Sequence, residues 1–154
     1  GLRYFNVFGR RQTAKSAYAA VIPLWIHSII KNKNIFINGD GKTSRDFCYI
    51  KNAVQANILA ATTSNVDALN TIYNVAVGDR TSLNELYLQL KKLIDKVTKI
   101  PHSKLNYRDF REGDVRHSQA DISKISDLLS FKPTHRINAG LAETVNWHLQ
   151  RIKK

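Results

Sequence analysis

Cysteine is almost missing from this 154-residue chain, since Cys48 is its only one. A lone cysteine excludes an intrachain disulfide and a zinc site built on cysteines. The five histidines do not have the spacing of metal ligands, so we predict no metal site. Long hydrophobic runs are also absent: the longest apolar stretch, AYAAVIPLWI, is too short to cross a bilayer and contains Pro23. With no secretory signal before the first apolar segment, we expect a reducing, cytoplasmic setting and no membrane partner.

Methionine is absent as well, and Gly1 opens directly into the apolar segment LRYFNVFG. Open reading frames start with methionine, and domains rarely open inside a strand. We therefore expect residues 1–154 to be the C-terminal portion of a longer protein. The length itself suits one domain.

Acidic residues are few relative to basic ones: 24 lysines and arginines face 12 aspartates and glutamates, which gives a net charge of +12. Such a balance favours anionic partners, whether nucleic acid, acidic lipid or phosphorylated small molecules. The charge does not distinguish among these three classes.

Runs rich in β-branched and aromatic residues alternate with amphipathic runs along the chain, which predicts an α/β fold. The predicted strands are residues 2–8, 35–37, 46–50, 71–77 and 104–110, and the predicted helices are 19–32, 53–64, 82–97, 121–131 and 138–152. The clearest helix begins with a capping box of Ser82 and Glu85 ahead of a leucine stripe. Asn52 is predicted to cap the helix that follows it.

The stretch GDGKTSRDF, residues 39–47, lies between two of the predicted strands. Asn-Gly and Asp-Gly between β-rich runs predict a hairpin that joins 35–37 to 46–50. From local sequence alone, Lys42 and Arg45 read as solvated charges at its end. The alternative is that Arg45 points at a phosphate, because a guanidinium can donate two parallel bonds to phosphate oxygens.

A second charged cluster, DFREGDVRHSQAD, places Arg111 and Asp114 three residues apart around Gly113. An arginine can hold a phosphate, and a carboxylate can accept from two sugar hydroxyls. One anion binder beside one diol binder suits a nucleotide diphosphate. Asn6 ends the first predicted strand, where ligands of open α/β sheets bind. A charged surface loop and a chain-turning asparagine remain the alternatives.

Two signals resemble dehydrogenase motifs but are interpreted as structural. Tyr87 and Lys91 have the Tyr-x-x-x-Lys spacing, yet they lie on the leucine-striped helix, where residues four apart are neighbours by geometry. Gly39-Asp40-Gly41 lacks the third glycine and the following helix of a dinucleotide-binding loop.

Five strings occur in one order along the chain: LRYFNVFGRRQ, AYAAVIPLW, INGDGKTSRDFCYIKNAVQAN, YNVAVGDRTSLNEL and REGDVRHSQAD. Together they resemble the C-terminal half of NAD-dependent nucleotide-sugar epimerases, which are extended short-chain dehydrogenases/reductases. The nearest resemblance is to the branch that epimerises UDP-N-acetylglucosamine, or its uronic acid, at C4 for surface polysaccharide synthesis. The implied fold is the last strands of a Rossmann-type sheet with a smaller α/β substrate-binding domain.

The resemblance implies ligand roles for single positions. Arg45 and Arg111 match the two arginines on the substrate diphosphate, and Asp114 matches the carboxylate on the uridine ribose. Asn6 matches the amide on the diphosphate sugar. Phe5 matches the residue whose backbone approaches the nicotinamide of NAD.

Further positions match the walls of the substrate site. The wall around the uracil would be formed by Ala20, Val21, Phe36 and Asn38. In the N-acetyl branch, Gln12 and Ser118 would line the acetamido pocket. Lys51 departs from the family, which often has an acidic residue there, and we expect no contact of Lys51 with the substrate.

The catalytic serine, tyrosine and lysine of the family and its glycine-rich NAD loop are expected in an N-terminal half, so this chain alone is predicted to be inactive. The full-length protein is expected to be a homodimer. A nucleotide-sugar 4,6-dehydratase or decarboxylase of the same superfamily remains an alternative. A basic nucleic-acid-binding module is the alternative from another class, but the lysines are scattered and no recognition motif occurs, so we expect no nucleic acid partner.

Overall fold

The computed structural model describes residues 1–14, 20–98 and 104–152. The helices in these ranges are α1 (Val21–Ile30), α2 (Ile50–Thr62), α3 (Leu83–Asp95), α4 (Ser123–Leu129) and α5 (Ile137–Ile152), with one 3-10 turn, η1 (Val66–Ala68). The strands are β1 (Leu2–Tyr4), β2 (Ile35–Asn38), β3 (Ser44–Arg45), β4 (Tyr73–Val75), β5 (Thr81–Ser82) and β6 (Leu105–Arg108). The α/β class predicted from the sequence is confirmed.

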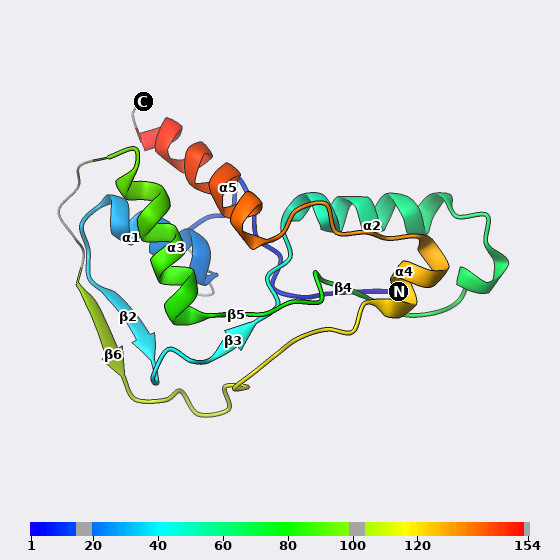
Figure 1. Ribbon diagram of the computed structural model, residues 1–154, viewed down its shortest axis with the longest axis horizontal. Coiled ribbons are helices and arrows are strands. Elements are labelled where there is room, and N and C mark those ends of the chain that lie inside the picture. The colour runs from blue at the N-terminus through cyan, green and yellow to red at the C-terminus, as the bar shows by residue number, and fades with distance from the viewer. Residues whose placement is uncertain (15–19, 99–103, 153–154) are drawn as a thin grey trace.

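The described strands pair two by two. β1 with β4 and β2 with β6 are parallel, whereas β3 with β5 is antiparallel. Figure 1 shows an elongated molecule in which β2, β6, α1, α3 and α5 occupy one end and β4, α2 and α4 the other. β3 and β5 lie between the two ends.

Each end of the molecule has its own apolar core. At the first end, the leucine stripe of α3 packs with α1, α5 and the inner face of β2, and Leu86, Leu90 and Ile94 are fully buried. Burial of one such side chain contributes about 1.5–3 kcal/mol. At the second end, Val75 of β4, Ile125 of α4 and neighbouring apolar residues of α2 form a separate cluster. The predicted capping box of Ser82 and Glu85 is present at the start of α3.

The predicted hairpin between 35–37 and 46–50 is wrong. β2 pairs with β6, some 70 residues later, with Ile35 opposite Leu105, and β3 pairs with β5. The local turn signal is real, since Gly39 and Gly41 both have positive φ. The turn redirects the chain toward the start of α3, because pairing with β6 buries Ile35 and Ile37 against the helices. Residues 46–49 run instead beside residues 6–8, with a parallel bridge from Phe8 to Tyr49.

Asn52 is not the predicted helix cap. α2 begins at Ile50, three residues before the predicted start, and its N-cap residue, Tyr49, makes no side-chain capping bond. Asn52 is buried within α2 and bonds to the segment before α5: its Nδ2 donates to the His135 carbonyl at 2.7 Å. Its Oδ1 accepts from the backbone N–H groups of Thr134 and His135 at 2.9 and 3.1 Å. A tertiary contact therefore replaces the expected local one.

Two further expectations can be compared with the fold. The strand predicted at 2–8 is shorter, because β1 ends at Tyr4 and Asn6 adopts a positive φ of 34°. The interpretation of Tyr87 and Lys91 as structural is supported: Tyr87 is buried with its ring edge-on to Trp25, and Lys91 pairs with Asp95 one turn along α3. Among the described residues, no helix has the length and apolar character that crossing a membrane requires.

Candidate functional site

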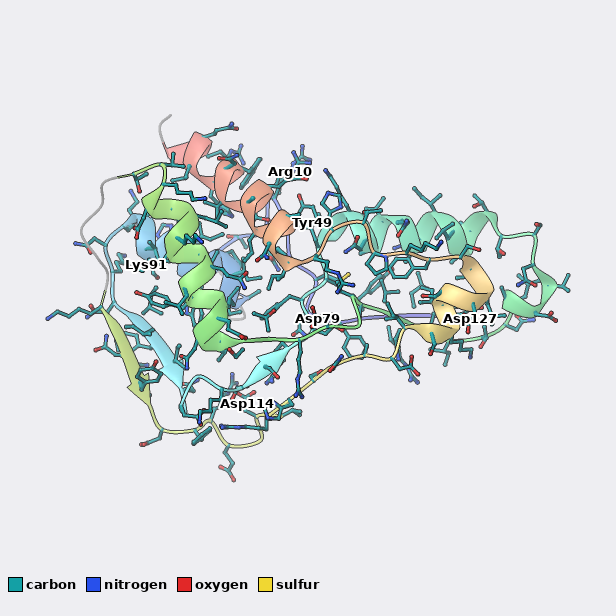
Figure 2. The ribbon with its side chains drawn as sticks, viewed as in Figure 1. Arg10, Tyr49, Asp79, Lys91, Asp114 and Asp127 are labelled. Atoms are coloured by element: carbon teal, nitrogen blue, oxygen red, sulfur yellow. The ribbon has the colours of Figure 1, made fainter. Side chains whose placement is uncertain are left out.

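A cavity of about 470 Å³ opens where β2, β3 and the starts of α1 and α3 meet. Its lining combines apolar side chains with two arginines, one carboxylate and two amides. The lining residues are Asn6, Val21, Leu24, Trp25, Phe36, Ile37, Asn38, Thr43, Arg45, Phe47, Leu83, Arg111 and Asp114. In Figure 2, Asp114 lies on the loop that follows β6 and passes below β3. A volume of this size is typical of small-molecule sites.

One wall of the cavity is the edge of β2 that no described strand covers. The N–H groups of Ile35 and Gly39 bond to the carbonyls of Lys104 and Arg108, on the β6 side. Successive residues of a strand point their N–H and C=O groups to opposite edges. Phe36 and Asn38 therefore present their backbone polar groups on the free edge, and both residues line the cavity.

Arg45 supplies a largely buried cation to the cavity, with a side chain only 18% exposed. Its Nη1 donates to the Ser44 carbonyl at 2.9 Å, and its Nη2 lies 3.2 Å from Asp114 Oδ1. Asp114 is 44% exposed. Arg111, the second arginine, is exposed and forms no ion pair with any residue that the structure describes. The cavity thus has one cation held by hydrogen bonds, Arg45, and one exposed cation, Arg111, that has no ion pair among the described residues.

The segment that carries Asp114 is attached to β3 through Ser44. The Ser44 N–H donates to the Arg116 carbonyl at 3.0 Å, and the Ser118 N–H donates to the Ser44 carbonyl at 3.1 Å. Ser44 Oγ and His117 Nδ1 also share a hydrogen bond of 2.8 Å. These bonds explain how residues 69 apart in sequence, Arg45 and Asp114, come into contact.

Asp46 directly follows β3 and attaches that strand to the segments around residues 77 and 120. Its carboxylate is fully buried and accepts from the N–H groups of Val77 and Gly78 at 3.0 Å and of Ala120 at 3.3 Å. Burial raises the pKa of Asp46 above its ordinary value, and the three backbone donors oppose that shift. Asn6 Nδ2 donates to the Asp46 carbonyl at 3.0 Å, which turns Asn6 toward the cavity.

The loop that joins β2 to β3 is held on its outer side. Asn84 Nδ2 donates to the Asp40 carbonyl at 3.1 Å, while Asn84 Oδ1 accepts from the Tyr107 hydroxyl at 3.0 Å. Arg116 Nη2 pairs with Asp40 Oδ2 at 2.6 Å, and that hydrogen bond holds the pKa of the Asp40 carboxyl below its ordinary value. Gly41 lies so close to Asn84 that a Cβ would overlap its side chain.

Most of the residues that the sequence predicted for a ligand site meet in this cavity. Seven of them line it: Asn6, Val21, Phe36, Asn38, Arg45, Arg111 and Asp114. Four do not. Ala20 lines a smaller hollow next to Asn6 and Val21, Gln12 lines another with residues 7–11, Ser118 is bonded through its backbone to Ser44, and the Phe5 N–H donates to Val75.

Sequence reasoning missed part of the apolar wall. Leu24 and Trp25 belong to an apolar helix and were indistinguishable from core residues until α1 was placed beside β2. The sequence spacing could have identified Thr43 and Phe47. They stand two residues before and two residues after Arg45, and residues two apart in an extended segment face the same side.

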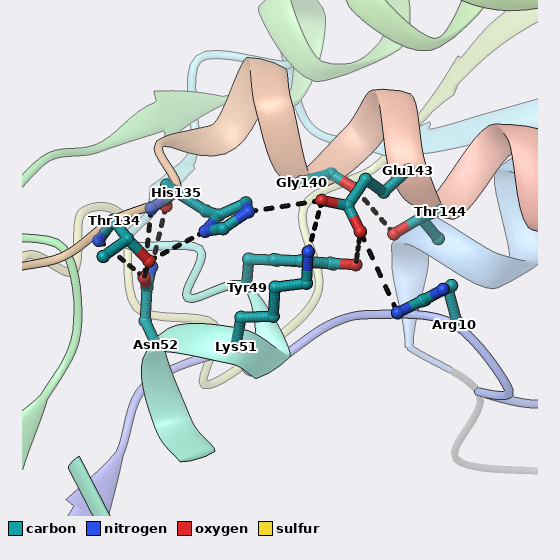
Figure 3. Close-up of polar contacts among 9 residues, drawn as sticks. All are labelled: Arg10, Tyr49, Lys51, Asn52, Thr134, His135, Gly140, Glu143 and Thr144. Atoms are coloured by element: carbon teal, nitrogen blue, oxygen red, sulfur yellow. Dashed lines mark hydrogen bonds and ion pairs between the residues drawn. The ribbon is translucent and has the colours of Figure 1, made fainter. Parts of the chain in front are cut away.

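A polar cluster outside the cavity explains the departure at Lys51. Lys51 Nζ donates to Glu143 Oε1 at 2.8 Å and the Tyr49 hydroxyl donates to Glu143 Oε2 at 2.9 Å. His135 Nε2 lies 3.2 Å and Arg10 Nη2 4.0 Å from the same carboxylate (Figure 3). The basic residue at position 51 thus pairs α2 with α5, away from the cavity lining.

The fold is similar to that of solved UDP-sugar epimerases at 30% and 42% sequence identity. Residues 1–76 match the model of the NAD dependent epimerase/dehydratase family. The solved UDP-N-acetylglucosamine 4-epimerase from Methanobrevibacter ruminantium superposes with a TM-score of 0.85 at 42% identity, over 97% of this chain and 46% of that one.

Two curated relatives have similar coverage. A putative UDP-glucose 4-epimerase of Methanocaldococcus jannaschii is 36% identical over 95% of this chain and 44% of its own length. A UDP-N-acetyl-alpha-D-glucosaminuronate decarboxylase of Bacillus cytotoxicus is 31% identical over the same shares. The chain therefore spans less than half the length of the curated relatives it matches.

NAD is the cofactor of the family, and solved neighbours contain it. The residues of this chain do not fit a complete NAD site. The sequence has no glycine-rich phosphate loop between a strand and a helix, and Gly39 to Gly41 lead into β3 instead. Phe5, the predicted neighbour of the nicotinamide, uses its N–H in the pairing with Val75.

Proposed function

We propose that this chain binds the UDP moiety of a UDP-sugar as the substrate-binding part of an NAD-dependent UDP-sugar 4-epimerase. The observation that carries the proposal is the meeting of Arg45, Arg111 and Asp114 with the free edge of β2 in one cavity. These groups have the chemistry that a nucleoside diphosphate requires at its phosphates, its ribose and its base.

The free edge of β2 suits uracil. Phe36 offers an N–H and a C=O, and Asn38 offers the next N–H, so the edge reads donor, acceptor, donor along the strand. The pairing face of uracil reads acceptor, donor, acceptor, whereas cytosine mismatches at two of the three positions. Trp25 and Val21 of α1 line the same cavity and provide apolar surface for the base.

The charged groups suit the diphosphate and the ribose. Arg45, held by the Ser44 carbonyl, and the exposed Arg111 would bind the phosphate oxygens. The Asp114 carboxylate would accept from the ribose hydroxyls, and the Asn6 amide would contact the sugar diphosphate. Roles on the acetamido group are proposed for Gln12 and Ser118, which lie outside the cavity lining.

The sugar proposed is an N-acetylhexosamine or its uronic acid, supported by the 42% identity to a UDP-N-acetylglucosamine 4-epimerase. The proton and hydride steps at C4 would fall to a serine, a tyrosine, a lysine and NAD in an N-terminal half, with Phe5 beside the nicotinamide. This chain would bind and orient the nucleotide end and would be inactive alone. The complete enzyme is proposed to be a cytoplasmic homodimer in surface polysaccharide precursor synthesis.

A decarboxylase or 4,6-dehydratase is the second candidate, favoured by the 31% identity to a UDP-N-acetyl-alpha-D-glucosaminuronate decarboxylase. The nucleotide end would be held in the same way. The reactions differ in their products. Proton NMR of the products formed when the intact protein is incubated with UDP-N-acetylglucosamine or its uronic acid therefore distinguishes the two candidates. A C4 epimer supports the epimerase, whereas a decarboxylated or 4-keto-6-deoxy product supports the second candidate.

Binding is tested by isothermal titration of the intact protein with UDP. Arg45→Ala should weaken UDP binding about 10- to 100-fold, the scale of one or two charge-assisted bonds. Arg136→Ala is the matched control, because Arg136 is exposed, pairs with Asp79 and does not line the cavity. Equal affinity in the wild type and in Arg45→Ala would refute the assignment of Arg45 to the diphosphate.

A further inference from the structure

Arg45 and Asp114 are bonded to each other in the cavity in which each is proposed to hold a different part of the nucleotide. The Nη2 to Oδ1 distance is 3.2 Å, and both residues line the cavity. In this pair the Asp114 carboxylate accepts the hydrogen bond that a phosphate would otherwise accept from Arg45. The Arg45 guanidinium in turn donates to the carboxylate, as ribose hydroxyls would.

We propose that the Arg45–Asp114 pair is a selectivity device, which rests on the proposed function and deepens it. A ligand that carries both a vicinal diol and a phosphate replaces each partner of the pair at once. A ligand with phosphate alone frees Arg45 from Asp114 and leaves the carboxylate unpartnered beside new negative charge. The pair thus favours ribonucleotides over inorganic anions and 2′-deoxynucleotides.

The placement of Arg45 does not depend on Asp114. Its Nη1 donates to the Ser44 carbonyl at 2.9 Å, and Ser44 is in turn bonded to residues 116 and 118. The side chain of Arg45 is 18% exposed, so its position is restricted by packing as well. Removal of the Asp114 charge therefore leaves the cation in the cavity and available to a phosphate.

Asp114 is well situated for this exchange. Its side chain is 44% exposed and bonds to Arg45 through one oxygen, Oδ1. Ion pairs between partly exposed side chains contribute little to stability, so a ligand can open this one easily. A ligand that is only an anion is affected more by electrostatic repulsion from the freed Asp114 carboxylate. A nucleotide offsets this repulsion, because its ribose hydroxyls donate hydrogen bonds to that carboxylate.

The test measures binding of inorganic pyrophosphate, UDP and 2′-deoxyuridine diphosphate to the intact protein by isothermal titration. Asp114→Asn should bind pyrophosphate about 3- to 10-fold more tightly than the wild type and UDP more weakly. The preference for UDP over 2′-deoxyuridine diphosphate should fall toward one. Asp114→Glu keeps the charge and should show no gain for pyrophosphate.

Asp79→Asn is the matched control, because it removes one carboxylate from an exposed arginine pair outside the cavity lining. It should leave all three affinities unchanged. Circular dichroism of each variant verifies that it is folded.

Unchanged or weaker pyrophosphate binding in Asp114→Asn overturns the inference, and weaker binding would show that Asp114 positions Arg45. If pyrophosphate binds to neither protein, the inference is overturned as well. The proposed function fails separately: UDP would then not bind, or its affinity would not depend on Arg45.

Discussion

The hydroxyl of Tyr49 donates to Glu143 Oε2 at 2.9 Å across 94 residues of sequence. Figure 3 shows that Lys51, His135 and Arg10 also contact this carboxylate. Residues from three separate segments therefore meet at one side chain of α5. Tyr49 itself is fully buried beneath Gly140 of α5. Glu143 therefore ties α5 to the start of α2, next to the strand segment that leads from Arg45.

Glu143 predicts a specific dependence of stability on pH. The Lys51 hydrogen bond, followed by that of Tyr49, lowers the pKa of Glu143 from 4.5 to about 2. A folded-state pKa below the unfolded value means that this stabilisation is fully present above about pH 5 and is lost as the pH falls toward 2. The difference in free energy of unfolding between wild type and Glu143→Gln should therefore be largest near neutral pH and should shrink below pH 4.5.

Urea unfolding followed by circular dichroism at pH 7, 5, 4 and 3 measures that difference. Glu112→Gln is the control, because Glu112 is exposed and forms no ion pair within the described part of the chain. A difference for Glu143→Gln that stays constant from pH 7 to pH 3 would contradict the assigned role.

Asn52 predicts a large loss of stability on truncation. Asn52→Ala would leave the backbone N–H groups of Thr134 and His135 and the His135 carbonyl without their partner. Because Asn52 is fully buried, we expect the free energy of unfolding to fall by about 2–4 kcal/mol. Denaturant titration checks this, with Asn57→Ala on the exposed side of α2 expected to lose about 1 kcal/mol or less. Equal losses at the two positions would contradict the prediction.

Alanine substitutions at Gly41 and Gly113 distinguish the cost of backbone strain from the cost of steric overlap. Their φ angles are +73° and +76°, but a Cβ on Gly41 would overlap Asn84, whereas a Cβ on Gly113 would meet nothing within 4 Å. Gly113→Ala should therefore lose about 1–2 kcal/mol of stability from strain alone. Gly41→Ala should lose about 2–4 kcal/mol, because the loop must also shift.

Thermal and denaturant unfolding of both glycine variants provide the measurement. A double-mutant cycle with Asn84→Ala should recover the steric part of the Gly41→Ala loss and leave the strain. Losses of the same size at Gly41 and Gly113 would show that Asn84 yields without cost.

Local patterns predicted the elements well where short-range forces decide them. The leucine stripe of α3 and its capping box were readable, since both depend on residues three and four apart. The partner of β2 was not readable, because its pairing with Leu105 is fixed by burial of Ile35 and Ile37 and not by the turn at Gly39. The role of Asn52 was predicted wrongly because it too depends on a distant contact, since the partners of its side chain lie more than 80 residues away.

The candidate site was predictable in its charged residues and less so in its walls. From local sequence alone, Arg45 read as a solvated charge, and the loop with Arg111 and Asp114 could equally be a charged surface loop. The resemblance to nucleotide-sugar epimerases pointed to these three residues, and all three line the cavity. Trp25 and Leu24 resembled ordinary core residues. Their place in the cavity depends on the packing of α1 beside β2, which no local pattern specifies.

Arg45 and Arg111 are expected to differ in how much they contribute and in how salt affects them. Arg45 is largely buried and already oriented by Ser44, so a phosphate meets a fixed donor. Arg111 is exposed and must be ordered on binding, which offsets part of its gain. Arg111→Ala should therefore weaken UDP binding by about 3- to 10-fold in 0.15 M salt, less than the 10- to 100-fold expected for Arg45→Ala.

Titrations with UDP at 0.05, 0.15 and 0.5 M salt extend this comparison. The effect of Arg111→Ala should shrink as salt rises, because an exposed charge is screened over a Debye length of about 8 Å at 0.15 M. The effect of Arg45→Ala should change less, since its low-exposure position limits screening. If the two variants weakened UDP binding equally at every salt concentration, burial of Arg45 would not distinguish it from Arg111, and the two arginines would act as interchangeable surface charges.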